Sequence, residues 1–250
     1  MKSFSLKHLP LVCSIEELGR LPAGKLLINT INAHSYNTAR KDPAFAEALQ
    51  QGDALVPDGM SIVKACQWIN ADSKPVQRIA GWDLFCYEMS KAKGTVMFLG
   101  SSEETLAKIR AKAMKEYPLL KVVTYSPPYK AEFSDDDNKA MIEAVNSANP
   151  DLLWIGMTAP KQEKWAYSHW KELDIHCHCG TIGAVFDFYA GNTRRAPMWW
   201  QKHGLEWLYR LIKEPRRLWR RYIIGNVKFL CYMAKELRIQ NSKLTSLTHS

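Results

Sequence analysis

The chain has 250 residues, of which 46% are hydrophobic and 24% charged, a composition that indicates a globular protein with a buried core and excludes a disordered chain. It contains no run of the roughly 18 apolar residues that a membrane-spanning helix needs, and no apolar signal segment within residues 1–20. The formal net charge is +9, but residues 194–250 hold 13 Lys and Arg against 3 Asp and Glu, so residues 1–193 are close to neutral. We therefore expect a cytoplasmic protein whose C-terminal part alone binds an anionic partner: a membrane surface, a nucleic acid or a phosphorylated substrate.

Polar side chains follow the first two predicted strands. After an apolar strand over residues 25–29, Thr30 and Asn32 would project to the same side of an extended backbone. They could hydrogen-bond a sugar or a nucleotide, or Asn32 could cap the next helix. The second strand, residues 53–57, ends at Asp58, and Asp-Gly often marks only a turn. A predicted helix follows directly, which argues against a hairpin and puts Asp58 at the same sheet edge as Thr30 and Asn32.

Two further segments suggest phosphate binding. Arg78 precedes a predicted helix, and its guanidinium could bind a phosphate or carboxylate in a fork or form a surface ion pair. Residues 95–99 form the clearest buried strand, and Gly100 with Ser101 then turns into a charged helix. This turn resembles a nucleotide-phosphate loop, although the sequence has neither the G-x-G-x-x-G nor the Walker pattern.

The stretch from residue 151 to residue 165 changes from strand to helix within a few positions. Residues 152–155 are apolar and of strand length, and Pro160 suits the first position of a helix. Gln162 then lies at a helix N-terminus beyond a strand's carboxyl end, where an open α/β sheet binds ligands and helix N–H groups favour phosphate. The alternative is an ordinary strand-to-helix turn with a solvated polar face. A helix is predicted as far as residue 173, then a last strand over residues 174–179 and a tight turn at Gly183.

Strands and helices alternate throughout residues 1–193, which predicts an α/β domain with a mainly parallel sheet and helices on both faces. Six scattered cysteines without a framework of spacings indicate reduced thiols. In the motif His176-Cys177-His178-Cys179, strand geometry would send the histidines to one face and the cysteines to the other, so we expect no metal site there.

Residues 194–250 are predicted to form a helical, basic appendage. On a helical wheel that starts at Arg217, the side chains of Arg217, Arg221, Lys228 and Lys235 fall within about 40° of one another. Apolar residues fill the opposite arc: Leu218, Trp219, Tyr222, Ile223, Phe229, Leu230, Met233 and Leu237. This pattern is expected of an amphipathic helix at a membrane interface, and the alternative is a terminal helix packed on the core with a solvated basic face.

An ordered set of motifs spans residues 26–222. They are Thr30-x-Asn32, Pro57-Asp58-Gly59, Arg78-Ile-Ala-Gly-Trp-Asp83, Pro160-Lys-Gln-Glu163, Gly183-Ala-Val-Phe-Asp-Phe188, Ala190-Gly191, Arg195-Ala-Pro197, Leu205-Glu-Trp207 and Glu214-Pro-x-Arg217. With this set the chain resembles the WecG/TagA/CpsF family, glycosyltransferase family 26. Single motifs are weak, but their order is specific. Gln77, in place of an acidic residue, and Thr158-Ala159 depart mildly from the family pattern.

The resemblance implies a Rossmann-like fold and an inverting transfer of a sugar from a UDP-sugar to a lipid-diphosphate-linked sugar, without metal or cofactor. The donated sugar would be N-acetylmannosamine, N-acetylmannosaminuronate or a related hexose, for bacterial cell-surface polysaccharide or teichoic acid synthesis. The appendage would engage an anionic membrane surface on its cytoplasmic side as a peripheral protein and help to complete the active site. A homo-oligomer is left open.

The resemblance also implies roles for individual residues. Asp58 would be the catalytic base, and Thr30, Asn32 and Gln162 would bind the sugar. Diphosphate would be bound by Arg78, Arg217 and Arg221. Without an Asp-x-Asp metal motif, such fixed donors would have to neutralise the charge of the leaving UDP. Gly100, Ser101 and Gly183 are weaker candidates for contacts to the nucleotide.

Two other function classes compete with this interpretation. One is a nucleic-acid-binding protein whose basic aromatic tail stacks on bases, although no nucleic-acid module is recognisable and the near-neutral body would be unexplained. The other is a different nucleotide-dependent enzyme, such as a dehydrogenase, against which the missing dinucleotide fingerprint counts.

Overall fold

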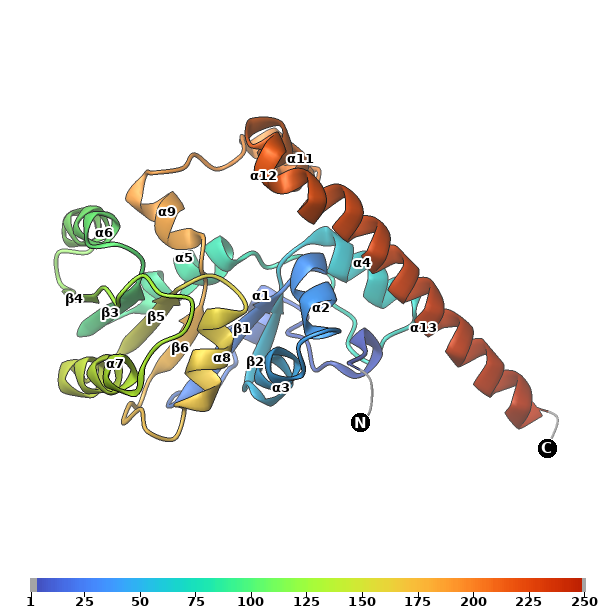
Figure 1. Cartoon of the computed structure of the whole chain (residues 1–250), viewed down its shortest axis with the longest axis horizontal. Helices are drawn as coiled ribbons and strands as arrows, with labels where there is room; N and C mark the ends of the chain where they lie inside the picture. Colours follow the sequence, from blue (N-terminus) through green and yellow to red (C-terminus); the bar gives the residue numbers. More distant parts are fainter. Residues whose placement is uncertain (1–3, 249–250) are drawn as a thin grey trace.

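A computed structural model describes residues 4–248, with side chains described up to residue 239 and at residue 242. Six parallel strands form one sheet in the order β2-β1-β6-β5-β3-β4 (Figure 1). The strands are β1 (Leu26–Ile31), β2 (Ala54–Pro57), β3 (Thr95–Gly100), β4 (Lys121–Tyr125), β5 (Leu152–Gly156) and β6 (His178–Thr181). The predicted mainly parallel, Rossmann-like sheet is confirmed.

Helices cover both faces of the sheet, as the alternating pattern predicts. They are η1 (Leu6–His8), α1 (Ile15–Leu18), α2 (Ala33–Ala39), α3 (Pro43–Gln51), α4 (Met60–Trp68), α5 (Gly81–Lys91), α6 (Glu103–Glu116), α7 (Asp135–Ala148), α8 (Lys161–Ser168) and α9 (Val185–Ala190). Side-chain oxygens cap several of them: Asp42 accepts from the N–H of Phe45, and Ser102 from that of Thr105.

Successive strand residues feed two different core layers. Val96 and Phe98 of β3 pack with α5, α6 and α9, whereas Met97 and Leu99 pack with α7 and α8. Because side chains alternate across a strand, an apolar run such as β3 can be buried on both faces only when helices cover both. The continuous apolar runs in the sequence are therefore the physical origin of the layered fold.

Strand β6 differs from the prediction. Residues 174–179 were expected to be extended, but β6 begins only at His178. Both of its neighbours set this limit, because Leu26 of β1 and Leu152 of β5 are each in register with His178. Helix α8 is also shorter than predicted, ending at Ser168 instead of residue 173. Its start is shifted too: Pro160 occupies the N-cap, one position before the first helical residue.

The C-terminal part is helical throughout its described length. It comprises α10 (Met198–Lys202), α11 (Glu206–Lys213), α12 (Pro215–Trp219), the π-helical turn η2 (Arg220–Ile224) and α13 (Gly225–Thr248). In Figure 1, α12 and α13 run almost continuously from the top of the molecule, and α13 passes α2 before extending beyond the body. Within the described residues, no helix has an apolar stretch long enough to cross a bilayer.

Helix α13 packs on the body through part of its surface. Phe229 and Met233 are buried in the core layer that includes Tyr36 of α2. Glu236 is also buried, and it accepts hydrogen bonds from the Tyr36 hydroxyl and from Ser5 Oγ, the latter at 2.8 Å. The alternative of a terminal helix packed on the core is thus observed for this face of α13.

Candidate active site

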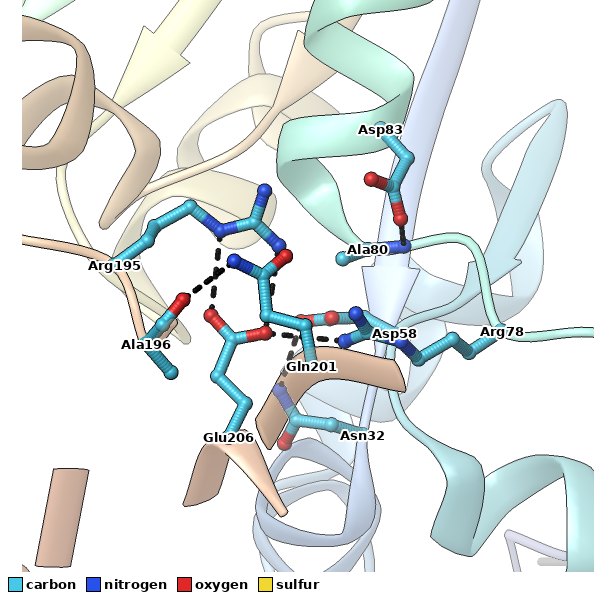
Figure 2. Close-up of polar contacts among 9 residues, drawn as sticks. All are labelled: Asn32, Asp58, Arg78, Ala80, Asp83, Arg195, Ala196, Gln201 and Glu206. Carbon is cyan, nitrogen blue, oxygen red and sulfur yellow. Dashed lines mark hydrogen bonds and ion pairs between the residues drawn. The ribbon is translucent and has the colours of Figure 1, made fainter. Parts of the chain in front are cut away.

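The carboxyl ends of β1 and β2 bring the predicted sugar-site residues together. Ile31 and Pro57 are paired in register, so the next residues, Asn32 and Asp58, lie side by side. Asn32 Nδ2 is 3.5 Å from Asp58 Oδ2 (Figure 2). Asn32 Oδ1 also accepts hydrogen bonds from the first N–H groups of α2, both at 3.0 Å. Asn32 is therefore a helix cap, which is one of the two alternatives from the sequence, and it also contacts Asp58.

Asp58 has an unusual electrostatic environment. Burial raises the pKa of its carboxyl, and the nearby carboxylate of Glu206 raises it further. The hydrogen bond from Asn32 and the charge of Arg78 act in the opposite direction but are smaller effects. The result is a carboxylate that is a stronger base than an exposed Asp, as proton abstraction requires.

Glu206, the first residue of α11, connects the appendage to the body. Its carboxylate is 3.1 Å from Arg78 Nη1 and 3.3 Å from Arg195 Nε (Figure 2). The side chains of Arg78, Arg195 and Glu206 are 19%, 15% and 17% exposed, so the ion pairs are largely shielded from water. The sequence left open whether Arg78 binds a ligand or forms a surface ion pair. An ion pair is observed, but it lies in a cavity wall and not on an open surface.

Gln162 lies in the first turn of α8 and is 3% exposed. Its Oε1 accepts from the backbone N–H of Met157 at 3.2 Å, and its Nε2 donates to Glu163 Oε1 at 2.9 Å. Gly183 packs against it so closely that a Cβ there would lie 3.2 Å from Gln162 Oε1. Gln162 and Glu163 of this strand-to-helix turn are therefore buried and do not form the solvated polar face of the alternative.

These residues line a cavity of about 570 Å³, here called the first cavity. It contains Thr30, Asn32, Asp58, Arg78, Gln162 and Gly183 in its wall. His34 also faces it, and burial together with the charge of Arg221 lowers the pKa of this histidine to about 4. At neutral pH the His34 ring is thus uncharged and adds hydrogen-bonding capacity without charge.

A second cavity of about 960 Å³ adjoins the first at the carboxyl ends of β3, β4 and β5. The residues common to both walls are Thr158, Ala159, Gly183, Ala184, Phe188, Arg210 and Arg221. Ser101 lines the second cavity, and Gly100 has a positive φ of 120°, where an added Cβ would lie 2.5 Å from the carbonyl oxygen of Gly156. Glycine is therefore required for the turn that presents Ser101.

The predicted tail arginines are placed differently from each other. Arg221 lies in the wall shared by the two cavities, and its Nε is buried with no hydrogen-bond partner among residues 4–248. Arg217 lines only the second cavity, is 65% exposed and pairs with Glu214 at 2.5 Å. Arg210, for which no role was predicted, also lines both cavities and also has a buried Nε without a hydrogen-bond partner among the described residues.

A sequence model described as the "Glycosyl transferase WecG/TagA/CpsF family" matches residues 6–243. The chain belongs to this family. It is 30% identical over 200 residues to the N-acetylglucosaminyldiphosphoundecaprenol N-acetyl-beta-D-mannosaminyltransferase of Bacillus subtilis (strain 168), covering 79% of this chain and 75% of that protein. The protein of the same name from Bacillus spizizenii is also 30% identical, over 78% of this chain and 74% of its own length. The sequence-based recognition is confirmed, and the chain is a glycosyltransferase.

In this WecG/TagA/CpsF member, the residues that sequence reasoning missed are Glu206, Arg195, Arg210 and Glu163. Glu206 and Arg195 stood within recognised motifs, but only the packing of the appendage shows that Glu206 pairs with both Arg78 and Arg195 and acts on the pKa of Asp58. The signal for Glu163 was its place in Pro160-Lys-Gln-Glu163, which does not reveal that the side chain is buried.

The His176–Cys179 motif lies apart from these cavities. Cys177 and Cys179 are buried beneath α7 and α8, whereas His178 contacts Glu88 at 3.2 Å and the carbonyl oxygen of Pro22 at 2.9 Å. The predicted divergence of cysteines from histidine is thus observed. Within the part of the chain that the structure describes, no group of three or more His, Cys, Asp or Glu side chains could hold a metal ion.

Proposed function

We propose that this glycosyltransferase moves a sugar from a UDP-sugar to a lipid-diphosphate-linked sugar, with inversion and with Asp58 as the base. The observation that carries the proposal is the position of Asp58. It lies in a cavity wall with a raised pKa, and the adjoining wall has two buried, unpartnered arginine Nε atoms. A base and anion-binding donors in the wall of one cavity are what an inverting transfer needs.

The proposed reaction is a single displacement. The acceptor hydroxyl gives its proton to the Asp58 carboxylate while its oxygen forms a bond to the anomeric carbon of the donor. The bond from that carbon to the UDP oxygen breaks, and UDP leaves with the electron pair. Fixed cations must then stabilise the charge that develops on the diphosphate.

The two cavities suggest how the donor lies. We place the sugar in the first cavity with Thr30, Asn32 and Gln162, and the nucleotide in the second with Ser101 and the turn at Gly100. The diphosphate would cross the shared wall at Gly183, where Arg210 and Arg221 have free Nε donors. Arg217 and Arg78 stay predicted diphosphate ligands, and each would have to share its charge with the glutamate that it already pairs with.

The acceptor follows from the relatives. Both Bacillus proteins are named for transfer of N-acetylmannosamine to N-acetylglucosaminyldiphosphoundecaprenol. By analogy, we propose an undecaprenyl-diphosphate-linked sugar as acceptor and N-acetylmannosamine as the first donor sugar to test. N-acetylmannosaminuronate and related hexoses are the next candidates. The products would enter cell-surface polysaccharide or teichoic acid synthesis, and the transfer would need neither metal nor cofactor.

A lipid-linked acceptor requires access to a membrane, for which we propose residues 194–250 as a membrane-associating appendage on the cytoplasmic face. Apolar side chains on one side of α12, η2 and α13 are exposed: Trp219, Ile223, Val227 and Leu230. We call these four residues the apolar stripe. Three basic residues of the same helical segment are also exposed: Arg216, Arg220 and Lys228. Apolar anchors beside basic residues are typical of helices that lie in the interface of an anionic bilayer.

The test is transfer from a panel of UDP-sugars to a short-chain lipid-diphosphate N-acetylglucosamine, with and without EDTA. The wild type should release UDP and form product with one of them. Asp58→Asn should lose 10²–10⁴-fold in rate, the usual contribution of a general base, while keeping its affinity for UDP. Asp53→Asn is the matched control, because Asp53 precedes the same strand at its opposite end and its carboxylate accepts from the N–H of Leu27. Full activity of Asp58→Asn would remove Asp58 from the mechanism, and loss with EDTA would contradict metal independence.

A further inference from the structure

Glu163 has a buried carboxylate oxygen to which the proposed reaction gives no role. The side chain is 1% exposed and lines the first cavity. Its Oε1 accepts the hydrogen bond from Gln162 Nε2, but its Oε2 has no hydrogen-bond partner within residues 4–248. Burial raises the pKa of this carboxyl to about 7. A buried carboxylate oxygen without a hydrogen-bond partner destabilises the folded protein unless a ligand supplies the missing hydrogen bond.

The cations nearest in sequence are engaged elsewhere. Lys161 donates to the carbonyl oxygen of Lys130 at 2.5 Å and lies over the Phe133 ring. Lys164 forms an ion pair with Asp42 at 3.0 Å. Neither lysine therefore neutralises Glu163, and its carboxyl forms no ion pair with any side chain that the structure describes. Places where a side chain lowers stability without a compensating contact are expected at functional sites.

The orientation of the Gln162 side-chain amide determines how the Glu163 carboxyl is hydrogen-bonded. The backbone N–H of Met157 can only donate, so Gln162 must turn its Oε1 towards it. The Nε2 group then faces Glu163 and keeps one N–H free. Gln162 and Glu163 consequently offer one donor and one acceptor from adjacent positions, a pair that suits a sugar.

We propose that Glu163 Oε2 accepts a hydrogen bond from a hydroxyl or acetamido N–H of the donor sugar, making Glu163 a substrate-contacting and specificity-determining residue. This inference rests on the proposed placement of the sugar in the first cavity. While Glu163 is ionised, a group that only accepts hydrogen bonds, such as the carboxylate of a uronic acid, is excluded from this position, because two carboxylates would then face each other away from water. The contacted position of the sugar must carry a donor.

The experiment compares wild type with Glu163→Gln and Glu163→Asp, using the preferred UDP-sugar and analogues that each lack one hydroxyl or the acetamido group. We expect kcat/KM for the full donor to fall 10–100-fold in both variants, with the affinity for UDP unchanged. For one analogue, the one that lacks the contacted group, wild type and Glu163→Gln should perform equally. A site built to bond a donor group rejects the analogue that lacks it, and removing the site's acceptor removes that preference.

Stability distinguishes this role from a structural one. Burial raises the pKa of the Glu163 carboxyl in the folded protein to about 7, above its value in the unfolded chain. The folded state therefore loses stability relative to the unfolded state as the pH rises from 5 to 8, because the carboxyl must then ionise while buried. Glu163→Gln should therefore melt at or above the wild-type temperature at pH 8, with the advantage shrinking towards pH 5. Glu88→Gln is the matched control, because Glu88 is also a buried carboxyl but is hydrogen-bonded to His178 at the amino end of β6. Its replacement should lower the melting temperature and leave kcat/KM unchanged.

Calorimetric titration with the UDP-sugar and with UDP alone tests the contact separately from transfer. If the wild type binds the UDP-sugar more tightly than UDP and Glu163→Gln removes that difference, the inference holds even where no product forms, and only the proposed reaction fails. If Glu163→Gln binds and transfers every donor like the wild type, or melts lower with unchanged kcat/KM, the inference is wrong while the proposed reaction stands.

Discussion

Asp58 titrates beside three other charged side chains, which gives the pH profile a specific expectation. Glu206 raises the pKa of Asp58, Arg78 lowers it and Asp83 raises it slightly. Since the base must be ionised, kcat/KM should fall as the pH drops through this raised pKa. Glu206→Gln removes the negative charge and releases Arg78, and both changes stabilise the ionised Asp58. We therefore predict that Glu206→Gln moves the acid limb of kcat/KM to lower pH.

The measurement is kcat/KM of wild type and variant between pH 4 and pH 8. Glu214→Gln serves as control, because Glu214 also pairs with an appendage arginine but is absent from the surroundings that shift the pKa of Asp58. An acid limb that stays in place in Glu206→Gln would mean that another group sets it.

At the residue scale, the sequence predicted the position of site residues that directly follow strands. It did not predict those whose position depends on the packing of the appendage against the body. Asn32 and Asp58 could be expected to meet because parallel strands end at one edge, and the pairing of Ile31 with Pro57 confirms this. Glu206 could not be expected there, because its position depends on how α11 folds back on the body. Arg217 and Arg221 looked equivalent on a helical wheel, yet only Arg221 lines both cavities.

The turn between β6 and α9 contributes Gly183 and Ala184 to the walls of both cavities. Gly183 there has a φ of 44°, and a Cβ would lie 3.2 Å from Gln162 Oε1. We predict that Gly183→Ala lowers stability by roughly 1–2 kcal/mol, the cost of a left-handed conformation for a residue with a Cβ. It should also lower kcat/KM at least tenfold, because Gln162 must move.

Gly191, which ends α9, provides the control for backbone strain alone. Its φ is 80°, but a Cβ added there would have no heavy atom within 4 Å. Gly191→Ala should thus lose similar stability in thermal unfolding and retain its kinetics. Equal kinetic losses in the two variants would show that strain, and not the contact with Gln162, affects the enzyme.

At the element scale, apolar runs were enough to predict the sheet and its covering helices. The ends of the strands were less predictable, because they depend on the neighbouring strands. Strand β6 begins level with the first residues of β1 and β5, although the sequence predicts an extended backbone for residues 174–177 as well. The tail helix was predicted with one apolar arc. The structure divides that arc, because Phe229 and Met233 contact α2 while Ile223 and Leu230 stay exposed.

Over the whole molecule, the division of α13 determines how attachment to a membrane can be tested. Phe229 and Met233 belong to the shared core, so deleting the appendage would expose apolar surface of the body as well as remove a membrane contact. A sharper change is confined to the apolar stripe, whose members Ile223 and Leu230 are each 54% exposed. Replacing exposed residues leaves the core contacts of α13 intact.

We predict that Ile223→Asp combined with Leu230→Asp abolishes binding to anionic liposomes and preserves both folding and transfer to a water-soluble acceptor analogue. Burying one such side chain contributes about 1.5–3 kcal/mol, so each loss should weaken partitioning roughly 10–100-fold. Ile239→Asp is the matched control, since Ile239 is also an exposed apolar residue of α13 but lies about 180° from Leu230 around the helix. The readout is co-sedimentation with vesicles of phosphatidylglycerol and phosphatidylcholine at two salt concentrations. If the double variant sediments like the wild type, the apolar stripe does not face the membrane; if it sediments less but also fails on the soluble analogue, the stripe supports the active site itself.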